Sequence, residues 1–271
     1  MSETRSVAIL GVGTMGRAIA RRMMESGVAS ADRIRGTVKH DWEVDGAAEA
    51  LGIDVSRDNV AAATDADLIL ICTKPAGVAG VMEELAAGGA LDDDPLVVSI
   101  AAGVRTETIE AAAGRRVRVV RCMPNTPCLI GEGMIAICRG NHATRDDLKV
   151  AEAVLLPLGR VARVDEEHMD AVTGLSGSGP AFVYVIIEAL SEGGVMIGLP
   201  RKTAVEMAAQ TVRGAAGMVL STGRHPASLK DDVTTPAGCT ISALLSLEDG
   251  RLRSVLARGV QEAARAAGGL G

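Results

Sequence analysis

Residues 7–16 read VAILGVGTMG, and this stretch decides the fold of the first part of the chain. Four apolar residues suited to a buried strand run directly into a GxGxxG pattern formed by Gly11, Gly13 and Gly16. At a strand–helix junction the first glycine permits a tight turn, the second lets the backbone approach a pyrophosphate, and the third allows close helix–strand packing. The helix start then offers free N–H groups and a partial positive charge to phosphates. The stretch therefore predicts a dinucleotide site.

An alternating pattern extends outward from this junction to about residue 165. Short β-branched runs predict strands at residues 7–10, 34–38, 68–72, 97–100, 117–122, 134–138 and 161–164. Helical patterns separate most of them, for example at residues 17–26, 78–87 and 146–156. Strands that alternate with helices are typical of a parallel sheet covered on both faces. We therefore expect an α/β fold with a Rossmann-type, doubly wound, mainly parallel sheet over residues 1–165.

The pattern becomes helical in the remaining part, residues 166–271. Helical periodicity covers residues 180–197, 201–222, 239–247 and 251–267. Pro180 follows Ser178 and Gly179, which predicts a helix that begins at the proline. A second, all-helical domain of about a hundred residues is of ordinary domain size. Its large apolar content predicts that it pairs with a second copy of the chain.

The composition excludes several classes of protein. The 271 residues include one Trp, one Tyr and one Phe, so the core is aliphatic and few aromatic rings are available to stack on bases. A net charge of −6 with interleaved signs argues against a nucleic-acid partner. Five cysteines without a CxxC pair indicate reduced thiols rather than disulfides. The four histidines are dispersed, so we expect no metal site.

The same reading predicts a cytoplasmic protein. The apolar run near the N-terminus is too short for a secretory signal. The most apolar later segment, residues 182–199, contains Glu188 and Glu192, and carboxylates at a bilayer centre would be costly. We interpret this segment as a buried helix of a soluble protein and expect no membrane partner.

The end of the second predicted strand bears on the choice of dinucleotide. NAD enzymes usually place an acidic residue there to bind the ribose 2′-hydroxyl. Here the chain has Thr37, Lys39 and His40, whose hydroxyl and cationic groups suit a 2′-phosphate better. NADPH is therefore favoured, while the nearby Asp41 leaves NADH open as an alternative.

Two later strand ends support the cofactor site, because ligands of open α/β sheets bind at the carboxyl ends of strands. Cys72–Thr73–Lys74–Pro75 ends one strand, and Ile100–Ala101–Ala102–Gly103 ends the next with small residues that would admit a ribose or nicotinamide. Close packing explains the second segment equally well, and Lys74 is either a ligand or a surface charge.

The segment DVTTPAGCTI at residues 232–241 is the candidate substrate loop. Three threonine hydroxyls and consecutive backbone N–H groups precede a predicted helix, and such a helix start can hold a carboxylate without an arginine. A plain capping turn is an equally good explanation of the residues alone. The glycine-rich segment at residues 174–180 (GLSGSGP) is more simply explained by close packing than by backbone approach to a ligand.

These residues together resemble the pyrroline-5-carboxylate reductase family. The matching segments, which follow the chain from end to end, are VAILGVGTMG, ICTKP, VVSIAAGV, VRCMPNTP, DAVTGLSGSGPAFVY, GLPR, HPASLKD and DVTTPAGCTISALLSLE. The resemblance implies a Rossmann domain, a helical dimerisation domain and NAD(P)H-dependent reduction of 1-pyrroline-5-carboxylate to L-proline. It also implies a homodimer that can assemble further, in which the partner subunit contributes the substrate loop.

The resemblance assigns site residues in both parts. The implied substrate contacts are Glu166, Thr235, Gly238, Cys239 and Thr240, and we expect the hydroxyl of Thr240 to take part in catalysis. Ala237 and Cys239 depart from the residues usual in the family, so the loop geometry and the substrate range are open. The implied cofactor contacts are Leu10, Gly11, Val12, Gly13, Thr14, Met15, Gly16, Thr37, Asn59, Cys72, Thr73, Lys74, Pro75, Ile100, Ala101 and Ala102.

Three alternative functions remain. A related imine reductase would share these motifs. A β-hydroxyacid dehydrogenase resembles the chain in its two-domain plan but uses a lysine on the long helix, and residues 178–200 contain none. A non-catalytic dinucleotide-binding regulator is disfavoured by the intact Thr235, Gly238 and Thr240.

Overall fold

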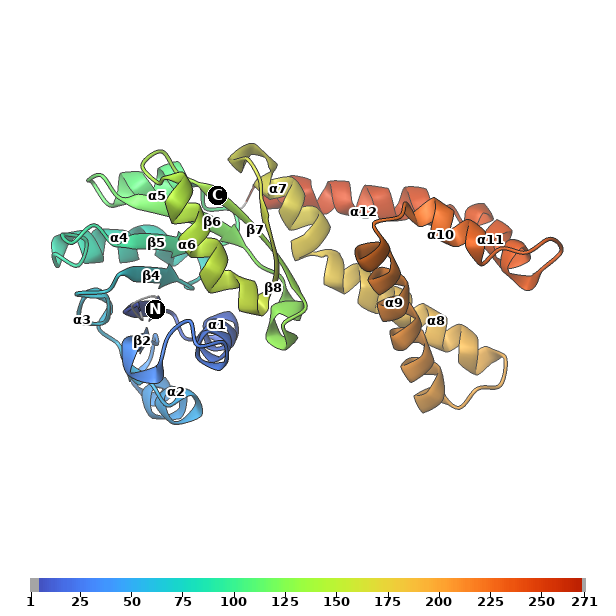
Figure 1. Ribbon diagram of the computed structural model, residues 1–271, viewed down its shortest axis with the longest axis horizontal. Coiled ribbons are helices and arrows are strands. Elements are labelled where there is room, and N and C mark those ends of the chain that lie inside the picture. The colour runs from blue at the N-terminus through green and yellow to red at the C-terminus, as the bar shows by residue number, and fades with distance from the viewer. Residues whose placement is uncertain (1–4, 270–271) are drawn as a thin grey trace. The chain divides into compact units, whose positions relative to one another are not determined.

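The first part of the chain is built around one eight-stranded sheet. A computed structural model describes residues 5–269 (Figure 1). The strand order is β3-β2-β1-β4-β5-β6-β7-β8. The strands are β1 (Val7–Leu10), β2 (Ile34–Thr37), β3 (Asp54–Ser56), β4 (Leu68–Ile71), β5 (Leu96–Ser99), β6 (Arg118–Met123), β7 (Gly133–Arg139) and β8 (Gly159–Arg163). Strands β1 to β6 run parallel, β7 is antiparallel to β6, and β8 is parallel to β7. The predicted doubly wound, mainly parallel sheet is confirmed.

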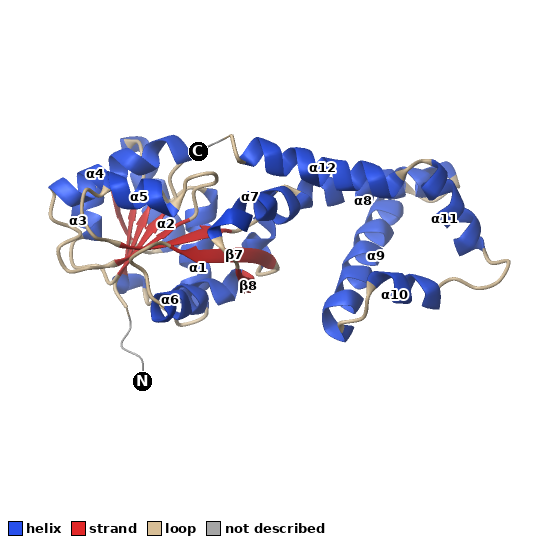
Figure 2. Ribbon diagram, turned by 90° about the horizontal axis from the view of Figure 1, so that it is seen from above, coloured by secondary structure: helices blue, strands red, loops and turns tan. Residues whose placement is uncertain are grey.

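Helices cover both faces of this sheet because each buried strand presents apolar side chains on both sides. Val7 and Ile9 belong to one apolar core, and Ala8 and Leu10 belong to the other. The first core is completed by α1 (Thr14–Glu25), α2 (Val44–Leu51) and α6 (Arg145–Leu155), and the second by α3 (Asn59–Ala63), α4 (Val78–Ala87) and α5 (Thr106–Ala112). Figure 2 shows the strands between these helices. The sheet therefore has the three-layer arrangement that brings the carboxyl ends of β1, β2, β4 and β5 to one edge.

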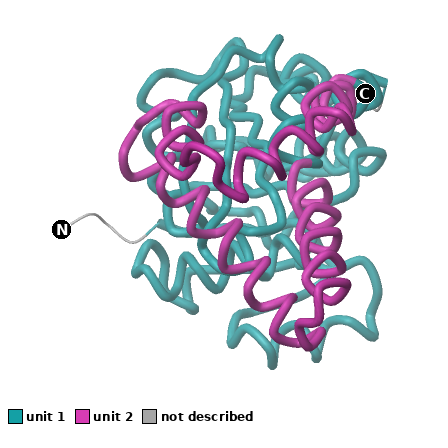
Figure 3. Tube along the Cα trace, turned by 90° about the vertical axis from the view of Figure 1, so that its right-hand side faces the viewer, with its two compact units in different colours: residues 1–178, 262–271 teal, residues 179–261 magenta. Residues whose placement is uncertain are grey.

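The chain forms two compact units, shown in Figure 3. The first comprises residues 1–178 and 262–271, and the second comprises residues 179–261. The second unit contains α8 (Gly179–Met196), α9 (Arg201–Thr222), α10 (Pro226–Asp232), α11 (Cys239–Asp249) and the first part of α12 (Leu252–Ala267). Its only buried residues are Ser191, Ala204 and Ala208. Within a single chain this unit therefore lacks an apolar core of its own.

The apolar helix α8 corrects one expectation from the sequence. It was expected to be buried, yet Ser191 is its only buried residue, and Tyr184, Val185 and Met196 are exposed. The stretch Glu166–Met196 is long and apolar enough to cross a membrane by length and composition alone. The physical reason for its exposure is that the apolar face of this helix needs the surface of a second chain to cover it, and a single chain does not provide that surface.

The helix expected from Pro180 is present as α8, which begins one residue earlier at Gly179, but the segment before it is not a turn. The chain is already helical from α7 (Met169–Val172) through a π-helical turn at Thr173–Gly177 and into α8. The Ser178 N–H donates a hydrogen bond of 2.9 Å to the carbonyl of Thr173, five residues earlier. The wider π turn carries the helix past the glycines without a break, so the segment expected to be a turn is helical.

Candidate active site

Each glycine of the GxGxxG segment is explained by a different feature of the structure around it. Gly11 has φ +97°, and a Cβ there would lie 3.0 Å from the carbonyl carbon of Cys72. A Cβ on Gly16 would lie 2.5 Å from the carbonyl oxygen of Gly11, so this glycine lets α1 pack against the end of β1. A Cβ on Gly13 would meet nothing within 4 Å. Gly11 and Gly16 are therefore required by close backbone contacts, whereas Gly13 lines an open space.

This open space suits a pyrophosphate. Gly13 is the N-cap residue of α1, and no side chain caps that helix start. The N–H groups in the first turn of a helix have no partner within the helix, and they carry partial positive charge. Thr73 adds a second observation, because its Oγ1 atom is buried without a hydrogen-bond partner among residues 5–269. The backbone N of Thr73 lies 3.1 Å from where a Cβ on Gly11 would be, so this unpaired hydroxyl belongs to a residue that contacts the glycine turn, and it suits a bound phosphate or ribose.

Strand register brings the two later candidate segments to the same edge. Leu10 is level with Ile71, and Ile71 is level with Ser99. The Cys72 N–H donates to the carbonyl of Leu10 at 2.8 Å, and the Ile100 N–H donates to that of Ile71 at 3.0 Å. The segments after β1, β4 and β5 therefore lie in adjacent positions, as a cofactor that crosses the sheet edge requires. The Lys74 side chain is exposed.

Thr37 and Asn59, the two remaining cofactor candidates, belong to a hydrogen-bond network. The buried Thr37 hydroxyl donates to Asn59 Oδ1 at 2.8 Å and accepts from the Gly11 N–H at 3.2 Å. The Asn59 amide in turn donates to Glu84 at 2.8 Å. The network ties the end of β2 to the glycine turn and to the start of α3.

Glu166 lies in the first unit, against residues that the sequence did not single out. Its carboxylate accepts hydrogen bonds from the N–H and hydroxyl of Thr106 at 2.7 and 2.6 Å. The buried guanidinium of Arg121 lies 3.4 Å from the same carboxylate and 3.6 Å from Asp170. A buried cation needs such partners, so Glu166 joins the start of α5 to β6. It also borders an open hollow of about 550 Å³ that Cys138, Asn141 and Arg163 help to line.

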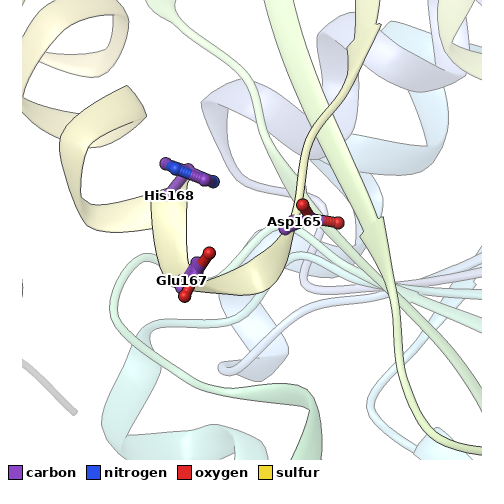
Figure 4. A group of neighbouring side chains, drawn as sticks. All are labelled: Asp165, Glu167 and His168. Carbon is purple, nitrogen blue, oxygen red and sulfur yellow. The ribbon is translucent and has the colours of Figure 1, made fainter.

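Three exposed neighbours of Glu166 form a cluster that the sequence did not predict. Asp165, Glu167 and His168 offer ligand atoms within 4.8 Å of one another. Figure 4 shows these three side chains. Exposed acidic side chains often gather without binding an ion. The cluster by itself therefore assigns no metal site.

The candidate substrate loop joins α10 to α11 in the second unit. Its turn is closed by a 3.0 Å hydrogen bond from the Gly238 N–H to the carbonyl of Thr235, and a Cβ on Gly238 would clash with the Thr235 hydroxyl. Ala237 adopts φ +55°, a left-handed conformation that its Cβ disfavours. The N–H of Gly238 is therefore already used, and the free donors are the first-turn N–H groups of α11, which begins at Cys239.

Asp232, just before this loop, forms an ion pair with Arg224 at 2.6 Å. The hydrogen bond from Arg224 lowers the pKa of the Asp232 carboxyl, and Arg224 also donates to the Ser228 hydroxyl at 2.8 Å. The pair therefore braces α10 immediately before the loop.

Asn125, which lies within the segment VRCMPNTP, has a structural role that its sequence neighbours do not reveal. Its side chain accepts a 2.9 Å hydrogen bond from the Met134 N–H and donates a 3.1 Å hydrogen bond to the carbonyl of Ser176. It thus joins the end of β6, the start of β7 and the π-helical turn. The residues that it joins are 9 and 51 positions away in the sequence, so no local pattern indicates this role.

The cysteines lead to a simple test. Only Cys239 is exposed, while burial raises the pKa of Cys72 and Cys138 to about 12. Thiolates rather than thiols are the reactive form. We expect a disulfide reagent at pH 8 to modify one thiol per native chain rapidly and the others only after unfolding. Cys239→Ser should remove the rapid phase, and a second rapid thiol would contradict this arrangement.

Comparison with known proteins gives matches along the whole chain. Residues 166–270 match a family model described as pyrroline-5-carboxylate reductase dimerisation, and residues 6–103 match one described as NADP oxidoreductase, coenzyme F420-dependent. A pyrroline-5-carboxylate reductase from Glycine max is 39% identical over 97% of this chain and 95% of its own length.

Solved structures agree with these matches. The structure of a pyrroline-5-carboxylate reductase from Coxiella burnetii aligns with a TM-score of 0.91 and 34% identity over 99% of both chains. That of a Plasmodium falciparum pyrroline carboxylate reductase with NADP bound aligns with a TM-score of 0.88 and 27% identity, again over 99% of both chains.

Proposed function

This chain belongs to the pyrroline-5-carboxylate reductase family, and from that premise we propose how its residues reduce 1-pyrroline-5-carboxylate to L-proline with NADPH. The observation that carries the proposal is the open space at Gly13 in the glycine turn at the carboxyl edge of the sheet, together with the unpaired hydroxyl of Thr73, a residue that contacts Gly11 of the same turn. The first-turn N–H groups of α1 would hold the pyrophosphate there. Segments 72–75 and 100–102 would contact the nicotinamide half of the cofactor, and Thr37 and Asn59 would support its adenosine half.

The chain forms a homodimer through its helical dimerisation region. The near absence of buried residues in the second unit gives the physical reason, since its apolar helices need a partner surface. We propose that residues 166–271 form this dimerisation and substrate-binding domain and residues 1–165 the dinucleotide-binding domain. We also propose that the partner subunit's loop completes each active site.

The bound cofactor would supply the hydride, and the protein has to bind and orient the imine. The Thr240 hydroxyl would hydrogen-bond to the ring nitrogen and stabilise the amine that forms. No lysine, histidine or tyrosine lies within residues 233–241. We therefore propose that the imine binds already protonated, which makes a strong general acid unnecessary.

The substrate carboxylate would bind at the start of α11. The backbone N–H groups of Cys239 and Thr240 are free for this purpose, whereas that of Gly238 closes the turn. Thr235 and Gly238 therefore support the loop geometry. Glu166, held by Thr106 and Arg121, remains a proposed substrate contact.

Thr240→Ala is expected to lower turnover about tenfold or more. The loss of one hydrogen bond to a developing charge costs about 1–3 kcal/mol, and 1.36 kcal/mol corresponds to a factor of ten in rate. Steady-state NADPH oxidation at saturating substrate measures the effect. Thr240→Ser, which keeps the hydroxyl, is the matched control and should retain most of the activity. Wild-type turnover in the alanine variant would show that the hydroxyl has no catalytic role.

One assay tests the function as a whole. NADPH oxidation is followed in parallel with pyrroline-5-carboxylate, with other cyclic imines and with β-keto acids. We expect the first to be the best substrate by kcat/KM. A preference for another cyclic imine would indicate a related imine reductase, a preference for keto acids would indicate a hydroxyacid dehydrogenase, and binding without turnover would indicate a regulator.

We infer that the enzyme is cytoplasmic. Glu188 and Glu192 lie within the apolar helix α8, where a membrane interior would penalise both carboxylates. Five free cysteines are consistent with a reducing compartment.

A further inference from the structure

Lys39, a cationic candidate for the 2′-phosphate, is exposed in the turn after β2, whereas the cofactor candidates Thr37 and Asn59 carry no charge. The side chain of Thr37 is buried, with its hydroxyl already donating to Asn59 and accepting from Gly11. The Asn59 amide is engaged with Glu84. These side chains shape the end of β2 but have no free charge to offer a phosphate. The groups that can recognise a 2′-phosphate must therefore be exposed and adjacent.

Arg57 occupies that position. It directly follows β3, the neighbour of β2 at the edge of the sheet. The Val38 N–H donates to the carbonyl of Ser56 at 3.0 Å, so the two chains still lie side by side where their strands end. This contact places Arg57 next to the residues that follow Thr37. An arginine there can approach a group bound over the end of β2.

The guanidinium of Arg57 is bound by Asp41 through one nitrogen only, which leaves its other donors available. Its Nη1 atom lies 3.0 and 2.9 Å from the two carboxylate oxygens of Asp41. Its Nε and Nη2 groups have no hydrogen-bond partner among residues 5–269, and about half of the side chain is exposed. A guanidinium presents planar, paired donors that match phosphate oxygens, and it can bind a phosphate while one nitrogen stays on a carboxylate.

Two aromatic rings lie in the same turn. His40 and Trp42 stack with ring centroids 4.1 Å apart and an interplanar angle of 7°. Trp42 is 78% exposed, although it is the single tryptophan of the chain. The turn is ordered by a 3.1 Å hydrogen bond from the His40 N–H to Glu43. A flat, ordered and exposed ring pair beside the end of β2 suits stacking of a purine.

We propose that Arg57 binds the 2′-phosphate of the cofactor and so determines the preference for NADPH over NADH, with the stacked His40–Trp42 pair as the platform for the adenine. This inference rests on the proposed function, because it concerns the adenosine end of the same cofactor. Asp41 orients Arg57 in the free protein and competes with the phosphate for it. Removal of either member of the ion pair should therefore affect binding in opposite directions.

The test uses two ligands that differ only in the 2′-phosphate, 2′,5′-ADP and 5′-AMP, with Kd measured by calorimetry. The wild-type protein should bind 2′,5′-ADP about tenfold or more tightly than 5′-AMP, since charged hydrogen bonds contribute about that factor or more. Arg57→Gln should abolish this ratio with little change for 5′-AMP. Asp41→Asn should tighten 2′,5′-ADP about twofold to fivefold, because it removes a competing charge of the same sign.

Arg115→Gln is the matched control. Arg115 is a similarly exposed arginine that pairs with one aspartate, Asp92, but it precedes β6 and so lies toward the opposite edge of the sheet. Its replacement should leave both affinities unchanged. If Arg57→Gln and Asp41→Asn weaken both nucleotides together, the ion pair is only structural and the proposal is wrong. An unchanged ratio in Arg57→Gln also overturns it.

Trp42 provides a second readout that does not depend on turnover. Because it is the only tryptophan, its fluorescence reports the platform alone. Saturation with either nucleotide should quench or shift its emission, and an unchanged emission at calorimetric saturation would refute the platform. A wild-type protein that binds neither nucleotide nor NADPH would instead refute the dinucleotide site. If the Arg57→Gln variant oxidises NADPH normally and still prefers 2′,5′-ADP to 5′-AMP as the wild-type protein does, only the assignment of Arg57 is refuted.

Discussion

Replacement of Gly13 by Glu is expected to raise the Kd for NADPH more than about a hundredfold while leaving the free energy of unfolding nearly unchanged. A Cβ at Gly13 would meet no atom within 4 Å, so a side chain can leave the backbone there without a clash and the fold should tolerate it. The same space is where we place the pyrophosphate. A carboxylate about 4 Å from a phosphate opposes binding by about 4 kcal/mol at an effective dielectric constant of 20, and 1.4 kcal/mol corresponds to a factor of ten in affinity.

Calorimetric titration with NADPH, combined with urea unfolding, measures both quantities. Ala87→Glu is the matched control, because it adds the same charge at an exposed position at the end of α4. It should bind NADPH normally. Tight binding by the Gly13 variant would mean that the cofactor does not cross the start of α1.

Gly16→Val is expected to destabilise the first unit by about 3 kcal/mol or more and to eliminate cofactor binding. A Cβ at this position would lie 2.5 Å from the carbonyl oxygen of Gly11, and that backbone atom cannot rotate away. Helix α1 would have to move off the end of β1, against apolar contacts through the fully buried Ile19 and Met23. Overpacking of a close-packed core typically costs about 1–3 kcal/mol, and a clash with the backbone lies at or above that range.

The midpoint of urea unfolding measures this loss. Gly46→Val in α2 is the control, since it makes the same change within a helix where a Cβ meets nothing within 4 Å. Its stability should change by less than about 1 kcal/mol, as helix propensity alone predicts. Equal stability of the two variants would contradict the role of Gly16 in helix–strand packing.

Much of the first unit could be predicted because its signals are local. The predicted helix over residues 78–87 matches α4 (Val78–Ala87), and the first predicted strand matches β1 (Val7–Leu10). Hydrophobic periodicity and glycine spacing involve residues that are close together in the sequence, so the sequence alone predicts the elements that they form. The elements it missed were short or weakly patterned, such as β3 (Asp54–Ser56), α3 (Asn59–Ala63) and α10 (Pro226–Asp232).

The sequence by itself therefore determined the doubly wound sheet, the glycine turn at its first junction and the helical second part. Only the tertiary structure decided that the hydroxyl of Thr37 is satisfied by Asn59, that Arg57 meets Asp41, and that Glu166 meets Thr106 across 60 residues. It also decided that the glycine-rich segment before α8 is a π-helical turn rather than a loop. The reason is that these partners are set by strand order and register, which bring distant side chains together and leave no pattern in the neighbouring residues.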